Sequence, residues 1–110
     1  MVSVQDVRKT LRKLGRKRHA RALQRYFKTG PGEYADGDVF LGIRVPRLRK
    51  LAREHRDLRL KDVERLLQSA VHEERLFALL LMVNRFPRAG RVEQRKIYSL
   101  YFRNTQFVNN

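Results

Sequence analysis

The helical spacing of its apolar residues constrains the fold of this chain more than any other feature. Along most of the sequence, apolar side chains recur every three or four positions, the spacing that gathers them on one face of an α-helix. No segment alternates polar and apolar residues with a period of two over a useful length, as a half-buried strand would. The sequence therefore predicts an all-α fold.

Glycine, proline and capping residues divide this pattern into about six predicted helices. Ser3 followed by Asp6 forms a capping-box signature for the first helix, and Gly15 ends it. Pro46 suits the first position of the third helix, because the N–H that proline lacks would be unpaired there anyway. Helices joined by short connections predict an α-solenoid of antiparallel helical pairs. The predicted helices span residues 4–14, 16–29, 46–55, 61–68, 71–86 and 91–102.

Two of the predicted helices carry apolar faces of different width. In the second, Ala20, Leu23 and Phe27 share one face, with Tyr26 beside them. In the fifth, apolar residues cover most of the circumference, so this helix should be the central and most buried element. Its first turn carries Glu73 and Glu74, which the sequence indicates as partners of the helix dipole and not as an acid/base pair.

The length of 110 residues fits one domain. We expect a single helical-repeat domain over residues 1–110, with a basic helical pair at 1–29, a loop rich in Gly, Pro and Asp at 30–39, and further helical pairs at 40–110. The absence of cysteine excludes disulfides and cysteine nucleophiles. With no secretory signal and no apolar run near the roughly 20 residues of a membrane span, we expect an intracellular, cytoplasmic protein that associates with the nucleoid.

Positive charge dominates the surface that these helices must present. The chain has 26 Lys and Arg against 11 Asp and Glu, a formal net charge of +15. No acid occurs between Val7 and Gly32, and a second basic stretch at 44–59 is diluted only by Glu54 and Asp57. A compact body of this charge repels itself unless it meets a polyanion, and phosphates of a double helix release condensed counterions when they are neutralised. The predicted partner is therefore a double-helical nucleic acid, contacted mostly through its phosphates.

The first predicted helix concentrates this charge on neighbouring turns. Arg8 and Arg12, and likewise Lys9 and Lys13, lie at i,i+4 spacing. Like charges at this spacing destabilise a helix. The pattern therefore indicates that an anion compensates them.

Sequence patterns for catalysis and metal binding are missing. The histidines, His19, His55 and His72, have no metal-ligand spacing and fit surface or capping positions. No serine lies in a Gly-x-Ser-x-Gly elbow, and the Gly-Pro-Gly at 30–32 matches no phosphate-binding loop. The sequence therefore predicts no cofactor, no metal site and no membrane partner, and it leaves the oligomeric state open.

One block is more specific than the rest of the chain: Phe40-Leu41-Gly42-Ile43-Arg44-Val45-Pro46-Arg47-Leu48-Arg49. It resembles the Phe-Leu-Gly-Ile/Val-x-x-Pro-x-x-Arg block of the AlkD-like DNA alkylation repair enzymes. The segment from Ala22 to Lys28 is similar to that family's second helix with its Arg-Tyr pair. The segment at 73–83 resembles the helix after the family's Glu-rich turn, and the one at 97–110 resembles the run into its active segment. The resemblance covers the chain from about Ala20 onward.

The resemblance implies a HEAT-like, ARM-type superhelix that curves around duplex DNA with a positive concave face. It also implies a DNA glycosylase, a hydrolase that cleaves the N-glycosidic bond of alkylated purines such as 3-methyladenine or 7-methylguanine. Alkylation makes the base a cationic leaving group, and a carboxylate stabilises the sugar cation that develops. Tyr26 matches a family position close to the damaged nucleotide. The expected DNA-binding residues are Tyr26, Arg25, Arg18, Arg21, Lys28, Arg44 and Arg47.

The catalytic residues of the family have no counterpart in this sequence. In the family, a catalytic Asp and a stacking Trp lie in a Trp-Asp-x-x-Asp segment after the position of Asn109 and Asn110, and this chain contains no Trp. We therefore assign no catalytic residue and expect the chain to be the N-terminal part of a longer protein, inactive alone; the alternative is a naturally truncated paralogue. Two alternatives stay open at this point: a non-catalytic helical-repeat module that binds nucleic acid, and a scaffold that recognises an acidic protein surface.

Overall fold

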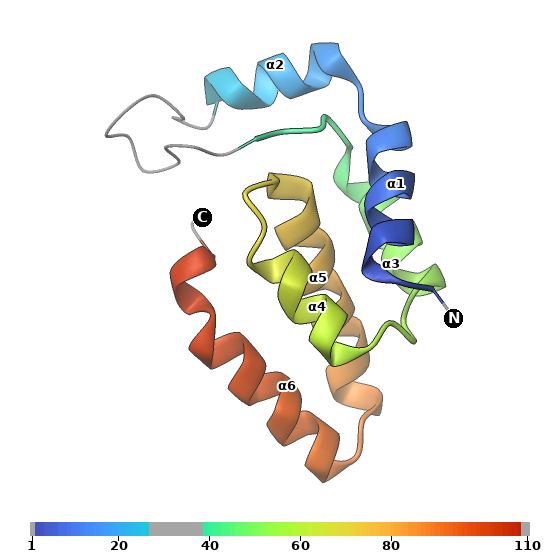
Figure 1. Cartoon of the computed structure of the whole chain (residues 1–110), viewed down its shortest axis with the longest axis vertical. Coiled ribbons are helices and arrows are strands. Elements are labelled where there is room, and N and C mark those ends of the chain that lie inside the picture. Colours follow the sequence, from blue (N-terminus) through green and yellow to red (C-terminus); the bar gives the residue numbers. More distant parts are fainter. Residues whose placement is uncertain (1, 27–38, 109–110) are drawn as a thin grey trace.

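Six α-helices and two short 3₁₀ helices make up the described part of the chain, residues 2–26 and 39–108, in the computed structural model (Figure 1). The only strand-like pairing within these residues is an isolated parallel bridge between Val39 and Val71. The predicted all-α class is thereby confirmed. The helices are α1 (Val4–Leu14), α2 (Lys17–Tyr26), α3 (Val45–Glu54), α4 (Leu60–Leu67), α5 (His72–Arg85), η1 (Phe86–Arg88), α6 (Arg91–Arg103) and η2 (Thr105–Phe107).

Two parts of the predicted organisation are not settled by these elements. The loop expected at 30–39 lies outside the described residues except for its last position. The stacking of successive helical pairs into a superhelix stays a prediction. None of the helices in the described ranges has the length and apolar character that crossing a lipid bilayer requires.

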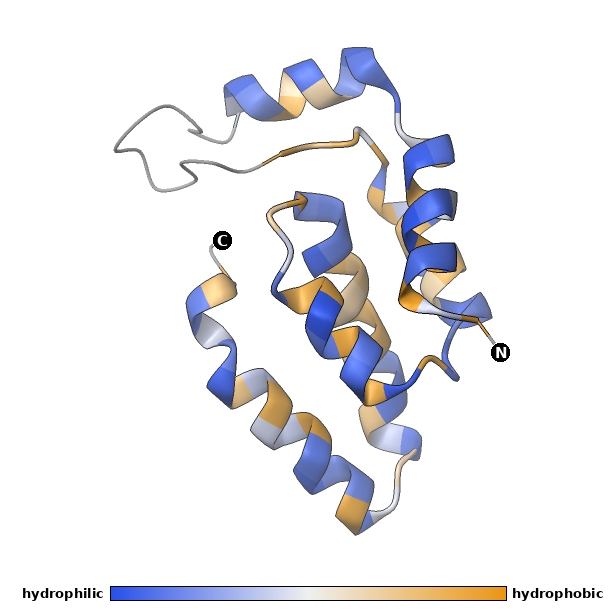
Figure 2. Ribbon diagram, viewed as in Figure 1, coloured by the Kyte–Doolittle hydropathy of each residue, from blue (hydrophilic) through white to orange (hydrophobic). Residues whose placement is uncertain are grey.

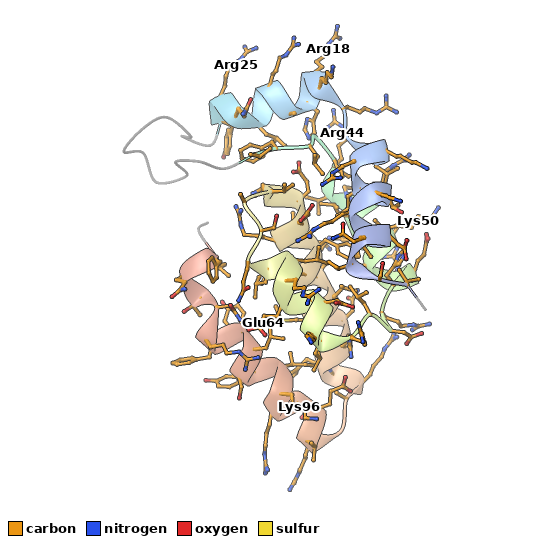
Figure 3. The ribbon with its side chains drawn as sticks, viewed as in Figure 1. Arg18, Arg25, Arg44, Lys50, Glu64 and Lys96 are labelled. Atoms are coloured by element: carbon orange, nitrogen blue, oxygen red, sulfur yellow. The ribbon has the colours of Figure 1, made fainter. Side chains whose placement is uncertain are left out.

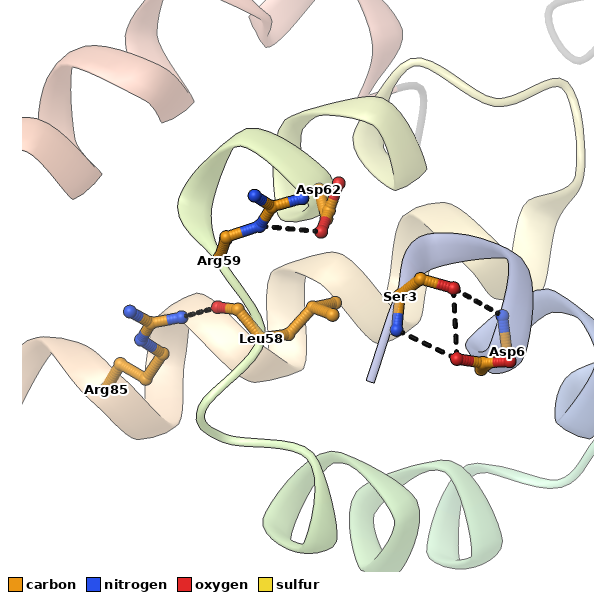
Figure 4. A network of polar contacts seen from close by, with 6 residues as sticks. All are labelled: Ser3, Asp6, Leu58, Arg59, Asp62 and Arg85. Carbon is orange, nitrogen blue, oxygen red and sulfur yellow. Dashed lines mark hydrogen bonds and ion pairs between the residues drawn. The ribbon is translucent and has the colours of Figure 1, made fainter. Parts of the chain in front are cut away.

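The first helix begins and ends where its capping residues predict. The backbone N–H of Ser3 donates to the carboxylate of Asp6 at 3.0 Å, and the N–H of Asp6 donates to the Ser3 hydroxyl at 3.2 Å (Figure 4). These bonds form a complete capping box. The hydrogen bond from the Ser3 backbone is the main cause that lowers the pKa of Asp6. At the other end, the N–H of Gly15 donates to the carbonyl of Leu11 and closes the helix.

The core lies around α5, as its wide apolar surface predicts. α5 packs against both α3 and α4, and its Phe77, Ala78 and Leu81 are fully buried. Apolar residues of the surrounding helices, coloured orange in Figure 2, join this core: Leu48 of α3, Val63 of α4 and Ile97 of α6 are buried. The apolar surface is not buried all round, however, because Val83 is 67% exposed. In the first turn of α5, by contrast, three charged residues are buried: Glu73, Glu74 and Arg75.

The apolar face of α2 is only partly buried. No residue of α2 is buried, and Ala20 and Leu23 are only half-buried. Phe27, the third member of that face, lies outside the described residues. The reason is the position of α2, which lies over the extended segment before α3 at one end of the molecule and not over the core helices (Figure 1).

A polar cluster joins the end of α6 to α4. The guanidinium of Arg103 donates two hydrogen bonds to the carboxylate of Glu64, at 2.8 and 3.0 Å. The buried amide of Asn104 donates to the same carboxylate at 2.7 Å and accepts from Gln68 at 2.8 Å. The bond from Arg103 and then the bond from Asn104 lower the pKa of Glu64. The cluster therefore ties the last helix to the core through a charged carboxylate.

We expect Glu64→Gln to reduce the free energy of unfolding near neutral pH by about 0.5–1 kcal/mol. The folded pKa of Glu64 lies below its ordinary value of 4.5, so its charge stabilises the fold fully above that value. The contribution is lost as the pH falls through the lowered pKa, and the variant should then match the original protein. Urea unfolding in neutral and in strongly acidic buffer measures the difference. Glu54→Gln, at an exposed position of α3, is the control; an equal loss for Glu64→Gln at both pH values would contradict this account.

Candidate nucleic-acid interface

A buried glutamate in α5 fixes the segment that leads into α3. Glu73 is 1% exposed, and its carboxylate accepts three hydrogen bonds from backbone N–H groups. The bond from Leu41 is 2.8 Å long, that from Gly42 is 2.9 Å and that from Ile43 is 3.3 Å. Glu73 does lie in the first turn of its helix, as the sequence predicts. Its main contacts, however, are with residues 30 to 32 positions earlier, which no local pattern reveals.

The same segment supports the start of α2 through close backbone contacts. Gly42 has a φ of 84°, and its carbonyl accepts a 3.1 Å hydrogen bond from the N–H of Arg16. A Cβ atom at position 42 would lie 2.1 Å from the carbonyl oxygen of Arg16, so only glycine fits. A Cβ atom at Gly15 would likewise lie 2.6 Å from the carbonyl oxygen of Leu41. The start of α2 is therefore held by backbone contacts with the 41–43 segment.

These contacts bring basic side chains from two parts of the sequence to one cleft. Arg18 from α2 lines the cleft together with Arg44 and Arg47 from the start of α3. All three are exposed. The cleft has a volume of about 480 Å³, and Arg16 and His19 line it as well. Neither Arg16 nor His19 is among the expected contact residues, although both lie close to Gly15, the glycine that separates the first two helices.

The other expected contact residues lie along α2. Arg21 and Arg25 are exposed and follow Arg18 at helical spacing. Figure 3 shows Arg18 and Arg25 projecting from the outer side of α2, with Arg44 on the segment beneath it. Tyr26 ends the helix with 79% of its surface exposed. Lys28 lies outside the described residues. The basic surface is defined from here on as Arg18, Arg21, Arg25, Arg44 and Arg47.

Among the described residues, no acidic side chain forms an ion pair with the basic surface. Most of the acidic side chains are engaged in contacts inside the fold, and none forms an ion pair with a residue of α2 or α3. Each ion pair that is present uses an arginine of another segment, and Figure 4 shows one of them at the start of α4. The pairs are Arg8–Glu74 at 3.0 Å, Arg59–Asp62 at 3.4 Å, Arg85–Glu93 at 2.7 Å and Arg103–Glu64 at 2.8 Å.

The pairing of Arg8 corrects the interpretation of the first helix. The sequence predicts that Arg8 belongs to a stack of positive charges on α1 that an anion, such as a nucleic-acid phosphate, compensates. The compensating anion is internal, because the guanidinium of Arg8 donates to the buried carboxylate of Glu74. Lys9, Arg12 and Lys13 remain exposed on the outer side of α1. α1 therefore contributes three cations, and not four, to the charged surface.

Comparison with known proteins identifies one family. A family model described as "DNA alkylation repair enzyme" matches residues 7–110. No significant match was found among curated proteins or among solved structures. In the described part of the chain, no three His, Asp or Glu side chains are placed to hold a metal ion together.

Proposed function

The chain belongs to the DNA alkylation repair enzyme family, and we propose that it is the DNA-binding scaffold of a glycosylase that acts on 3- or 7-methylated purines in duplex DNA. Family membership supports a role in DNA repair. The observation that carries the proposal is the basic surface, whose arginines come from α2 and the start of α3 and have no acidic partner among the described residues. A surface of one sign at this density favours a phosphate backbone as its partner.

The arrangement of these arginines suits contact with phosphates more than with bases. A guanidinium can donate two parallel hydrogen bonds to one phosphate, and it stays charged at any physiological pH. Base edges are read by an element that enters a groove. The basic surface instead combines the side of α2 with the segment beneath it. We therefore propose that this part of the protein fixes the position of the duplex and that it does not select a sequence.

The proposed chemistry needs a carboxylate beside the sugar of the damaged nucleotide. Hydrolysis of the N-glycosidic bond passes through an oxocarbenium-like state, which a negative charge stabilises. The buried acids of this fold already serve other contacts: Glu73 binds backbone N–H groups, Glu74 binds Arg8, and Asp62 binds Arg59. We therefore assign the grip on DNA to this chain and assign the catalytic carboxylate to none of its residues.

The engagement of the buried acids in other contacts favours a second candidate function, a helical-repeat module that binds nucleic acid without catalysis. The sequence has no Trp to stack on a damaged base. The engaged acids offer no carboxylate on the basic surface. The two candidates share the basic surface and differ only in bond cleavage.

Release of methylated purines from alkylated duplex DNA tests the glycosylase proposal. We expect chromatography to detect free 3- or 7-methylpurine bases after incubation of methylated duplex with a glycosylase that combines this scaffold with a catalytic carboxylate, and none after incubation with residues 1–110 alone. The triple variant Arg18→Gln, Arg21→Gln and Arg25→Gln should release less at low DNA concentration, because it removes part of the grip. Binding of the duplex without any release would instead support the non-catalytic module.

A further inference from the structure

We propose that the cleft between α2 and the start of α3 is a discrete binding site for one sugar–phosphate unit of a nucleic-acid strand. The proposal rests on the proposed function, because it names the part of the DNA that this surface takes. It goes beyond general charge attraction, since it predicts a saturable site at named residues. Its elements are the cleft, the cations on its walls and the apolar residues among them.

Among the described residues, the walls of the cleft carry cations from two segments and no acid. Arg16 and Arg18 come from the start of α2, and Arg44 and Arg47 come from the start of α3. None of the four arginines forms an ion pair with another described residue. The first turn of α2 also contains no acidic residue that would offset the positive end of its dipole. One phosphate can accept hydrogen bonds from more than one guanidinium group.

The size and the apolar lining of the cleft indicate more than a bare ion. Its volume of about 480 Å³ lies within the roughly 300–1,000 Å³ typical of small-ligand sites. Leu14, Ala22 and Ile43 line it beside the arginines. A deoxyribose ring is a ligand group of mixed character that can rest on such apolar side chains while its phosphate meets the guanidinium groups. The lining therefore fits a sugar–phosphate unit better than a free anion.

The base of the cleft is fixed before any ligand arrives. Gly42 and Ile43 line the cleft, and both donate their N–H groups to the buried carboxylate of Glu73. The carbonyl of Gly42 also holds the N–H of Arg16. A site that is ordered in advance loses less conformational entropy when it binds. In this respect the cleft differs from Arg21 and Arg25, which lie on the open side of α2 and are outside its lining.

A titration with the dinucleotide d(TpT), with inorganic phosphate as the comparison probe, tests the site by two-dimensional NMR. We expect saturable amide shifts confined to residues 14–22 and 42–47, with d(TpT) binding more tightly than phosphate. The double variant Arg44→Gln and Arg47→Gln should weaken d(TpT) binding at least about tenfold. The matched control, Arg49→Gln and Arg53→Gln, removes the same charge from exposed positions of α3 outside the cleft and should change it less than about twofold.

The outcomes separate this inference from the proposed function. Shifts that spread over all basic helices without saturation, or equal weakening by the two double variants, would overturn the cleft as a site even if the protein binds duplex DNA. Saturable binding of d(TpT) at the cleft supports the inference even if duplex binding fails, and that failure would then count against the proposed function alone.

Discussion

Replacing Glu73 with alanine is expected to lower the free energy of unfolding by about 3–5 kcal/mol, a large share of the roughly 5–15 kcal/mol that stabilises a domain. The substitution leaves the N–H groups of Leu41, Gly42 and Ile43 without their acceptor. These groups lie in and beside a buried segment, where an unpaired donor costs its full desolvation penalty. The effect should exceed that of any single exposed charge, because the lost contacts fix the path of the backbone into α3.

Urea unfolding followed by circular dichroism measures this effect. Glu54→Ala removes the same charge from an exposed position and should change stability by less than about 0.5 kcal/mol. Glu73→Gln keeps one carbonyl oxygen that can accept a hydrogen bond, but it places an NH₂ group near the remaining donors. It should therefore lie between the alanine variant and the original protein. Equal stability of the Glu73→Ala and Glu54→Ala variants would show that the carboxylate does not hold the 41–43 segment.

Gly42→Ala is expected to cost about 2–4 kcal/mol and to loosen the start of α2. Its φ of 84° is unfavourable for any residue with a side chain. The new Cβ atom would also lie 2.1 Å from the carbonyl oxygen of Arg16 and 2.7 Å from the N–H nitrogen of Ala20. Both are backbone atoms, so the clash cannot be relieved by turning a side chain.

Gly90→Ala is the matched control for this substitution. Gly90 precedes α6 with a φ of −73°, and a Cβ atom there would meet no atom within 4 Å. The control should therefore change the unfolding free energy by less than about 1 kcal/mol. Amide hydrogen exchange adds a local measurement, because Gly42→Ala should increase exchange in α2 more than in α5. Uniform protection in α2 after the substitution would contradict the proposed support by Gly42.

The helices could be predicted from the sequence because their signals are local. The Ser3–Asp6 capping box and the proline at position 46 act within one turn, and both appear in the structure. Pro46 takes the second position of α3 and not the first, a difference of one residue. The core position of α5 could be predicted from its composition, because a helix that is apolar over most of its circumference packs against other helices on several sides.

The site could be predicted only in part, because its geometry depends on contacts between distant residues. Charge patterning selected Arg18, Arg44 and Arg47, which the fold brings to one cleft. It could not select Glu73, whose partners lie far away in the sequence. Nor could periodicity show that α2 lies on an extended segment, because an apolar stripe looks the same whether it faces a helix or a backbone. Arg16 and His19 were missed for the same reason.

The salt dependence of duplex DNA binding tests the central claim, that the basic surface holds the phosphate backbone. If the five arginines of the basic surface and Lys28 each contact one phosphate, the logarithm of the binding constant should fall with the logarithm of the salt concentration with a slope of about −5. The triple variant Arg18→Gln, Arg21→Gln and Arg25→Gln should reduce the magnitude of this slope by about 3. The matched control, Arg88→Gln, Arg91→Gln and Arg95→Gln, neutralises exposed arginines of η1 and the first half of α6, an element that begins at the end of the molecule opposite α2 (Figure 1).

Fluorescence anisotropy with a labelled duplex at several salt concentrations gives the slope for all three proteins, and circular dichroism confirms that each is folded. A steep slope for the original protein and the control, with a clearly shallower slope for the α2 variant, is the result predicted here. A flat salt response of the original protein, or equal slopes for the two triple variants, would contradict the claim that this surface grips the DNA backbone.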